Sequence, residues 1–586
     1  MNRRTQTAIA AAIAAALSLG LAACGNKDKD DTSGGDSAAT STTGPGAENG
    51  TIAGGTPVKG GTLTVLTNQD FAHLDPARNW TLPQMDFGTR LIYRTLVTFK
   101  AEPGAAGSEI VPDLATDVGR PSDGGKTWAF TLKDGLKYED GTPIKSSDIK
   151  YNVERSFSPD LTGGPDYAVQ YLAGGENYKG PLTGEHLPSI ETPDDKTIIF
   201  HLKRPVAEFS YTATLPTFAP VPPAQEKGTQ YDTRPFSSGP YKIESYDRGK
   251  QLVLVRNTNW EAGTDTVRKA YPDKIVVTQG LKGGQVDDRI IASDGADASS
   301  IEMPWMRPES VPKVLPKPDV KARMVAERTG CTDNLYMNTA KAPFDDPKVR
   351  EAVMYAVDKE AQVTAWGGPA LAEVATSYLP PSLTGGEKAD PLKIPATGNP
   401  EKAKELLKAA GKTDLKVSIT VSLGDKTRGE AIQQSLSKVG IQVTVNTVDP
   451  SAFTDTLGDT KSAPELTING WCPDYPSGAT FLPFIFDGRT IKEKGNQGNY
   501  SQFRDQATMD EMDRIAALTD VNEANKAWKK LDEDLMTKSF PAVPLMWQRR
   551  ALLIGTNVAG AFGNSGYAGM IDMATIGLKD PSKSQG

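Results

Sequence analysis

The first half of the chain contains short stretches in which apolar and polar residues alternate, the pattern of strands with one buried face. The clearest is Thr127-Trp-Ala-Phe-Thr-Leu132, and Asp-Gly pairs at 134–135 and 140–141 provide hairpin signals after it. Ser146-Ser147-Asp148 then predicts the cap of a helix. Strand, turn, strand and capped helix in this order predict α+β packing for this part.

The second half alternates helical and strand patterns more regularly. Helices are predicted to begin at Asp346-Pro347 and Asn399-Pro400, where a capping side chain precedes a proline at the first helical position. Alternating apolar residues predict strands at 415–421, 441–445 and 466–470. Strands that alternate with helices predict a mostly parallel sheet in an α/β fold.

The last of these strands leads into the segment Trp471-Cys-Pro-Asp-Tyr-Pro-Ser477. Asp474 is therefore predicted to lie at the carboxyl end of a strand, where ligands bind in open α/β sheets. Pro473 and Pro476 restrict the backbone around it. A carboxylate in a closing cleft is costly to desolvate unless a cation meets it, which predicts a site for a positive group. A structural salt bridge or an Asx turn is the alternative.

Composition indicates a folded protein of several domains, or of one large interleaved domain. The chain has 586 residues, of which 38% are hydrophobic and 24% charged. Its formal net charge of −8 argues against nucleic-acid binding, which needs a basic face. Apart from residues 8–23, no apolar run approaches the roughly 20 residues of a membrane helix.

That apolar run has the architecture of a secretory signal peptide, with a basic start and an Ala-rich core. Leu21-Ala22-Ala23-Cys24 is similar to a lipobox, in which the cysteine is acylated and becomes the new N-terminus. The following residues are rich in Gly, Ser, Thr and Asp, with almost nothing to bury. The sequence predicts a lipoprotein signal peptide at 1–23, lipidation of Cys24 and a flexible tether at 24–57. An ordinary signal peptide with an incidental cysteine is the alternative.

Signals for catalysis or metal binding are weak. The three histidines, His73, His186 and His201, lack the spacing of metal ligands, and Gly563-Asn-Ser-Gly566 is not a nucleophile elbow. His73, beside the first strand, is expected to be structural or at the surface. We therefore expect no metal, no cofactor and no enzymatic activity. A secreted hydrolase of unfamiliar type, or a surface adhesin or sensor, stays open as an alternative.

Five blocks in a fixed order, behind the lipobox, carry a resemblance to a known family: residues 111–157, Ser238-Gly-Pro-Tyr241, Arg256-Asn257, Phe344–Ala352 and Gly470–Asp474. Together they resemble the family 5 solute-binding proteins of ABC importers, the oligopeptide-binding type. The resemblance covers roughly residues 60 to 575.

The resemblance implies a two-lobed α/β fold, the type II fold of periplasmic binding proteins, with an extra subdomain and hinge closure on a ligand. Lobe one is expected to be assembled from three segments of the chain. The expected assignments are 58–80, 205–330 and 546–586 for lobe one, 81–204 for the extra subdomain and 331–545 for lobe two.

The implied function is capture of peptides, oligopeptides first among them, and their delivery to ABC permease subunits with a cytoplasmic ATPase. The protein is expected to be a monomer, held by a lipid anchor on the outer face of the cytoplasmic membrane. In the family, an Asp-Pro pair commonly follows a few positions after the aspartate. This chain has Tyr475-Pro-Ser-Gly478 there instead. An oligosaccharide or another small solute is therefore the alternative ligand.

The resemblance also implies roles for individual residues. Asp474 would pair with the α-ammonium group of a peptide, and the main chain of Gly470 and Cys472 would bond to it by strand augmentation. Trp471 would line a side-chain pocket, or alternatively a lobe core, and Asp70 and Phe71 would face the cleft from lobe one.

A disulfide between Cys331 and Cys472 is implied in the same way, because related proteins link these two places. Pairing also suits an exported protein with two cysteines left after lipidation. Two buried free thiols are the alternative.

Overall fold

The computed structural model describes residues 52–383, 387–496 and 498–584. The predicted signal peptide, Cys24 and all but the last residues of the predicted tether lie outside this part. Within it, no helix is both long and apolar enough to cross a membrane.

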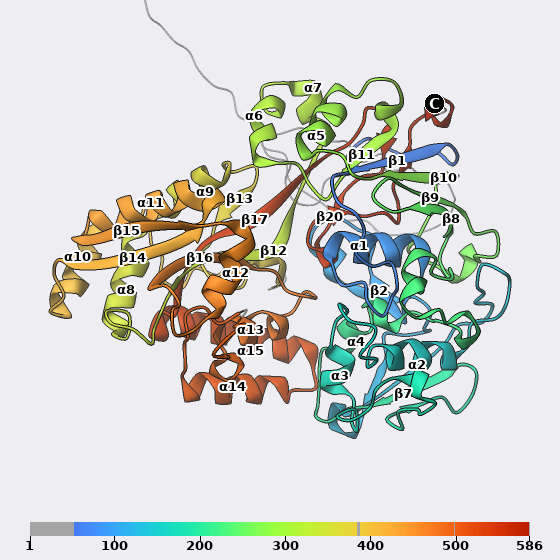
Figure 1. The fold of residues 1–586 in the computed structure, drawn as a ribbon, viewed down its shortest axis with the longest axis horizontal. Helices are drawn as coiled ribbons and strands as arrows, with labels where there is room; N and C mark the ends of the chain where they lie inside the picture. Colours follow the sequence, from blue (N-terminus) through green and yellow to red (C-terminus); the bar gives the residue numbers. More distant parts are fainter. Residues whose placement is uncertain (1–51, 384–386, 497, 585–586) are drawn as a thin grey trace, which may run out of the picture. The chain divides into compact units, whose positions relative to one another are not determined.

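A five-stranded sheet gathers strands from residues 62–303 (Figure 1). Its order is β11-β1-β10-β9-β8; β1 runs parallel to β10 and β11, and the other pairs are antiparallel. Leu63 and Val65 on β1 are fully buried, as their alternation with threonines predicts. The strands are β1 (Thr62–Thr67), β8 (Tyr241–Asp247), β9 (Gln251–Arg256), β10 (Lys274–Thr278) and β11 (Ser300–Met303).

A six-stranded sheet forms the centre of the second half, in the order β13-β17-β12-β16-β14-β15. β14 is parallel to β15 and β16, whereas β12 is antiparallel to both β16 and β17. The predicted mostly parallel sheet is therefore wrong: the sheet is mixed, because two long strands far apart in sequence enter its middle. The strands are β12 (Met324–Met337), β13 (Ala372–Val374), β14 (Leu415–Ser422), β15 (Ile441–Val448), β16 (Leu466–Trp471) and β17 (Ala542–Leu553).

Local capping signals place the helices of the second half. Asp346 accepts a hydrogen bond from the Lys348 amide, and Asn399 accepts one from the Lys402 amide, as the sequence predicts. The helices packed around this sheet are α8 (Pro347–Ala356), α9 (Lys359–Trp366), α10 (Pro400–Ala409), α11 (Lys426–Ser437), α12 (Pro450–Gly458), α13 (Leu482–Phe486), α14 (Gln506–Ala516) and α15 (Val521–Asp534).

A smaller antiparallel sheet, β4-β5-β7-β6, contains the aromatic-rich stretch predicted as a strand. β5 pairs with β4 and with the distant β7, so the predicted hairpin after Asp134-Gly135 does not form. The following helix is capped by Asp148, which accepts from the Lys145 amide, while the Ser146 hydroxyl donates to a loop carbonyl. These elements are β4 (Arg120–Ser122), β5 (Thr127–Thr131), β6 (Ile190–Glu191), β7 (Thr197–His201) and α2 (Ser146–Arg155).

Two large apolar cores hold these elements together. One core joins the five-stranded sheet to the smaller antiparallel sheet, and the other surrounds the six-stranded sheet. Short elements complete the described fold: α1 (Leu82–Phe87), α3 (Tyr167–Tyr171), α4 (Phe209–Thr212), α5 (Gly283–Ala292), α6 (Val311–Val314), α7 (Pro318–Lys321), β2 (Val97–Phe99), β3 (Ile110–Pro112), β18 (Val558–Ala559), β19 (Gly563–Asn564), β20 (Met570–Ile571) and β21 (Gly577–Leu578).

Candidate functional site

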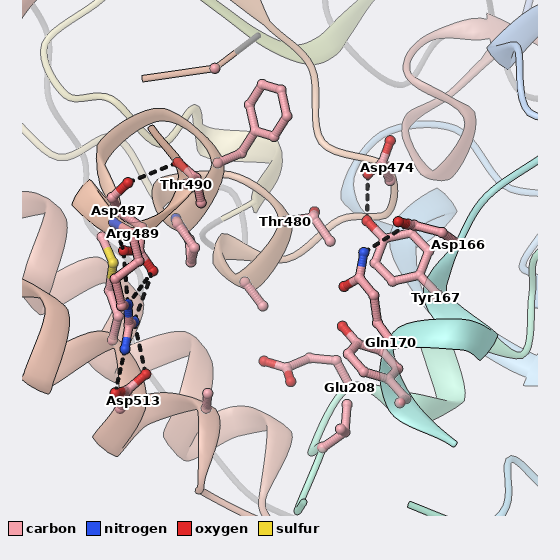
Figure 2. Close-up of a pocket in the computed structure, with 18 of the residues that line it drawn as sticks. Asp166, Tyr167, Gln170, Glu208, Asp474, Thr480, Asp487, Arg489, Thr490 and Asp513 are labelled. Carbon is pink, nitrogen blue, oxygen red and sulfur yellow. Dashed lines mark hydrogen bonds and ion pairs between the residues drawn. The ribbon is translucent and has the colours of Figure 1, made fainter. Parts of the chain in front are cut away.

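A cavity of about 840 Å³ lies between α3 and α4 on one side and the segment after β16 with α13–α15 on the other (Figure 2). This size suits a small organic ligand. One wall is formed by Trp80 and residues 166–171 and 204–208. The opposite wall is formed by residues between 471 and 528.

The disulfide between Cys331 and Cys472 ties the start of the second wall to β12. Thr332 pairs with Trp471 in the antiparallel register of β12 and β16, so the next positions outward are the two cysteines. Their Cα atoms lie 4.1 Å apart. Gly330, with a φ of +76°, turns the chain just before Cys331 and faces Pro473. The peptide between Cys472 and Asp474 is thereby held against a rigid strand pair.

A compact turn fixes the chain after Asp474. Ser477 accepts a hydrogen bond from the Ala479 amide, and the Thr480 hydroxyl donates to the Tyr475 carbonyl. The Tyr475 side chain is fully buried and stacks on Tyr211 at 5.8 Å between ring centroids. The backbone is therefore fixed on both sides of Asp474, by the Cys472 disulfide before it and by the buried Tyr475 after it.

Asp474 lines the cavity and accepts a hydrogen bond from the Tyr167 hydroxyl of α3 (Figure 2). Burial raises the pKa of its carboxyl to about 6, and hydrogen bonds from Tyr167 and Trp80 oppose part of that rise. The negative charge of Asp166 contributes a further rise in the pKa. Desolvation outweighs the hydrogen bonds, so the ionised form lacks full compensation.

No basic side chain of the described residues forms an ion pair with Asp474. The structural salt bridge, which was the alternative role for Asp474, is therefore not formed within the described part of the chain. The Ser477 amide donates to the Tyr475 carbonyl and the Ala479 amide to the Ser477 hydroxyl; neither donates to the Asp474 carboxylate, which also disfavours an Asx turn at Asp474. The carboxylate is left with two neutral donors, Tyr167 and Trp80, and the cavity beside it.

Trp471 also lines the cavity. Its indole nitrogen donates to the Thr480 carbonyl at 2.8 Å, and its ring stacks on Phe484 at 3.5 Å between centroids. Trp471 is half-buried against the second core. The two predicted roles, pocket wall and core residue, therefore coincide.

The other predicted contacts lie elsewhere. Gly470 and Cys472 are not among the cavity-lining residues, so their main-chain bonds to a ligand stay a prediction. Phe71 is a correction: it is 2% exposed and packs on Phe87 at 4.9 Å, because an apolar ring after β1 is buried more favourably than left in a cleft. Asp70 is exposed, accepts from Tyr246 at 2.9 Å and does not line this cavity, so its place facing the cleft stays a prediction.

Several lining residues were not predicted from the sequence: Trp80, Tyr167, Gln170, Arg204 and Glu208. They come from loops and short helices whose sequences have no local motif. Only the pairing of distant segments brings them to Asp474. Tyr167 shows this best, because it is separated from Asp474 by 307 positions.

The cavity also contains basic side chains. Arg489 is held by Asp487 at 2.8 Å and by Asp513 at 2.6 Å, so its charge is satisfied within the protein (Figure 2). Arg204 is exposed and its guanidinium lies 5.5 Å from the centre of the Tyr171 ring. The site thus offers both acidic and basic groups to a ligand.

Each histidine lies within hydrogen-bond distance of a carboxylate. His73 lies 3.0 Å from Asp232, His186 lies 2.8 Å from Glu154, and His201 lies 2.7 Å from Glu191. Within the described residues, no group of three His, Cys, Asp or Glu side chains is arranged to hold a metal ion.

Comparison with known proteins identifies a relationship over most of the chain. Residues 109–493 match the model of the bacterial extracellular solute-binding proteins, family 5. A probable D,D-dipeptide-binding periplasmic protein of Escherichia coli K12 is 26% identical, with 76% of this chain and 80% of that protein aligned. A glutathione-binding protein of Salmonella paratyphi A is 24% identical, with 75% and 81% aligned.

A solved structure shows the same similarity in three dimensions. The clavulanic acid biosynthesis oligopeptide binding protein 2 superposes with a TM-score of 0.83 at 30% identity. The alignment covers 91% of this chain and 99% of that one. The predicted α/β binding-protein fold is confirmed by this match and by the family model.

Proposed function

Because this chain belongs to the bacterial extracellular solute-binding proteins of family 5, we propose that it captures peptides, oligopeptides first among them, in the cavity beside Asp474. We further propose that it delivers them to the permease of an ABC importer. The family consists of solute-binding proteins and not of enzymes. The names of the three similar proteins, which refer to D,D-dipeptide, glutathione and oligopeptide, support a peptide ligand.

The observation that carries the proposal is the Asp474 carboxylate, which lines the cavity without a cationic partner among the described residues. A peptide's α-ammonium group supplies one compact positive charge and three hydrogen-bond donors. Ion pairing would favour the ionised carboxylate that burial now disfavours. In this role Trp471 would form the neighbouring wall, and Gly470 and Cys472 would offer main-chain groups as predicted.

The assignment of lobes belongs to the same proposal. Lobe one would comprise 58–80, 205–330 and 546–586, the extra subdomain 81–204, and lobe two 331–545. This division is supported by the five-stranded sheet, whose strands all fall in lobe-one segments. β12 and β17 each extend past the proposed boundaries, at residues 331 and 546, and would act as the connections at the hinge.

We propose that the protein is anchored through an acylated Cys24 after removal of the signal peptide 1–23. The tether at 24–57 would hold a monomeric body close to the permease, on the outer face of the cytoplasmic membrane. An extracellular family supports export.

Native mass spectrometry of the purified body, followed by calorimetric titration with the ligands it retains, tests the proposal. We expect retained peptides that rebind after partial unfolding and dialysis. Incubation with peptides and esters should give binding without turnover. Hydrolysis by the purified protein, or retention of a non-peptide solute alone, would contradict the proposed function.

One observation favours a second candidate, an oligosaccharide. Trp80 lines the cavity and is 39% exposed, which leaves an aromatic face available for stacking on a sugar ring. A sugar ligand would not need the charge of Asp474. Retained ligands identified as oligosaccharides, with affinity unchanged in Asp474→Asn, would establish this candidate instead.

A further inference from the structure

A second carboxylate faces the same cavity. Glu208, just before α4, is 4% exposed and lines the cavity wall (Figure 2). Its Oε1 atom accepts from the indole of Trp528 at 3.4 Å and from the Ser477 hydroxyl at 3.5 Å, both at the limit of a hydrogen bond. No basic side chain of the described residues forms an ion pair with Glu208.

Other buried acids of this protein show what a structural carboxylate looks like. Each oxygen of Asp532 accepts a backbone amide, from Tyr378 at 3.0 Å and from Leu379 at 3.1 Å. Glu154 likewise accepts from the Leu187 amide at 2.7 Å. Glu208 has no such amide bond from a neighbouring element, and its side chain extends toward the open centre of the cavity (Figure 2).

We propose that Glu208 is a second cation-recognition group, which selects peptides with a basic side chain in addition to the α-ammonium group bound by Asp474. This inference rests on the proposed function and names its substrate class. A buried carboxylate without a cationic partner carries a desolvation penalty, and a ligand cation reduces that penalty only when it reaches the cavity.

The cavity that Glu208 lines also offers apolar surface for the stem of a basic side chain. Val206, Met512, Ala516 and Ala517 add apolar surface to the cavity lining. Lys and Arg side chains pack their methylene stems on such surface and place the charge at its end.

Two neighbouring charges do not satisfy Glu208. Arg204 is four residues away, but it is exposed, stacks over Tyr171 and makes no ion pair with the carboxylate. Arg489, on the opposite wall, is already bonded to Asp487 and Asp513. Neither arginine therefore forms an ion pair with Glu208, although the charge of Arg204 lowers the pKa of its carboxyl in part.

The test is calorimetric titration of the full exported body with trialanine and pentaalanine series. In each series one alanine after the first is replaced in turn by lysine, by norleucine, which lacks the amine, or by acetyl-lysine, which lacks the charge. We expect wild type to prefer lysine over both neutral residues at one position by about 30-fold or more. Glu208→Gln should abolish that preference while the norleucine peptide binds within about threefold of wild type.

Glu261→Gln is the matched control, because Glu261 is exposed and pairs with Lys137 outside the cavity. It should keep the full preference for lysine. A preference that survives in Glu208→Gln, or wild type without preference at any position, overturns the role of Glu208. If Glu208→Gln does not fold, equal binding of the lysine and acetyl-lysine peptides by wild type still overturns the proposal. Absence of binding by every peptide in wild type would instead reject the proposed function.

Discussion

The hydroxyl of Tyr167 on α3 donates to the carboxylate of Asp474 just after β16, which joins the two walls of the cavity through one hydrogen bond. Tyr167 also packs against Tyr475 at 5.6 Å between ring centroids. The bond orients the carboxylate before a ligand arrives. Little side-chain freedom then remains to be lost on binding, which favours affinity.

Asp474→Asn should weaken peptide binding by roughly 2–5 kcal/mol, because the α-ammonium group is then buried without a partner. N-acetylation of the peptide should weaken binding to wild type by a comparable amount. The two losses should not add, since both remove the same ion pair. Calorimetric titration of both proteins with both peptides measures all four affinities.

Asp166→Asn provides the control for this cycle, because it removes an exposed carboxylate from the opposite wall of the same cavity. Its effect should be much smaller and should add to that of acetylation. Equal affinity of Asp474→Asn and wild type for free-amine peptides would reject the ion pair and favour an uncharged ligand.

The disulfide between Cys331 and Cys472 closes a loop with a sequence separation of 141. On the chain-entropy model such a closure stabilises by roughly 4–5 kcal/mol, and by less in practice. We expect no reactive thiol when the body lacking Cys24 is unfolded without reductant, and a lower denaturation midpoint for the double Cys→Ser variant. Two titratable thiols would show that the pair is reduced in the exported protein.

Cys24→Ser should release the protein from the membrane into the medium or the periplasm. Stable anchoring needs more than one acyl chain, so loss of the acylated residue removes the whole attachment. Fractionation of cells followed by titration of the released protein checks both location and affinity. The affinity should equal that of the anchored form; recovery of the variant wholly in membranes would contradict lipidation at this residue.

Features encoded by neighbouring residues were predictable from the sequence. Asp346 and Asn399 cap their helices through amides two or three positions away, so the pattern alone specifies the bond. The strand β16 was predictable from the alternation of its own residues. The disulfide was accessible only through a family resemblance.

Features that depend on distant segments were not predictable in this way. β12 and β17 enter the middle of the six-stranded sheet by pairing with each other across more than 200 positions. The alternation of residues within one strand contains no information about such a distant partner. Glu208 reaches Ser477 across 269 positions, and no motif marks it. Phe71 was misplaced because the family resemblance indicates which loop faces a cleft but not which side chains of that loop turn into the core.

Peptide affinity should depend on pH through Asp474. The pKa of this carboxyl is raised to about 6 in the ligand-free protein, and an ammonium ligand requires the ionised form. Affinity should therefore be constant above about pH 7 and fall toward tenfold per pH unit below pH 6, with one proton released on binding. Titration in buffers of different ionisation enthalpy measures that proton, and Asp474→Asn should remove this dependence.

The same raised pKa predicts a pH-dependent effect on the stability of the ligand-free protein. An unfolded aspartate has a pKa of about 3.8. Because the folded value is higher, the native state binds the proton more tightly, and stability relative to an uncharged side chain is lost as pH rises from about 4 to 6. Asp474→Asn keeps an oxygen for Tyr167 and removes the charge that burial disfavours.

Asp474→Asn should therefore raise the free energy of unfolding at pH 7 by an amount on the order of 2 kcal/mol, and this gain should vanish below pH 4. Urea denaturation at pH 4, 5, 6 and 7 measures the difference between the two proteins. Asp166→Asn should show a change of less than about 0.5 kcal/mol throughout. A variant that binds peptide worse yet folds more stably is the signature of a binding residue, since a structural carboxylate would lose stability at pH 7 when neutralised.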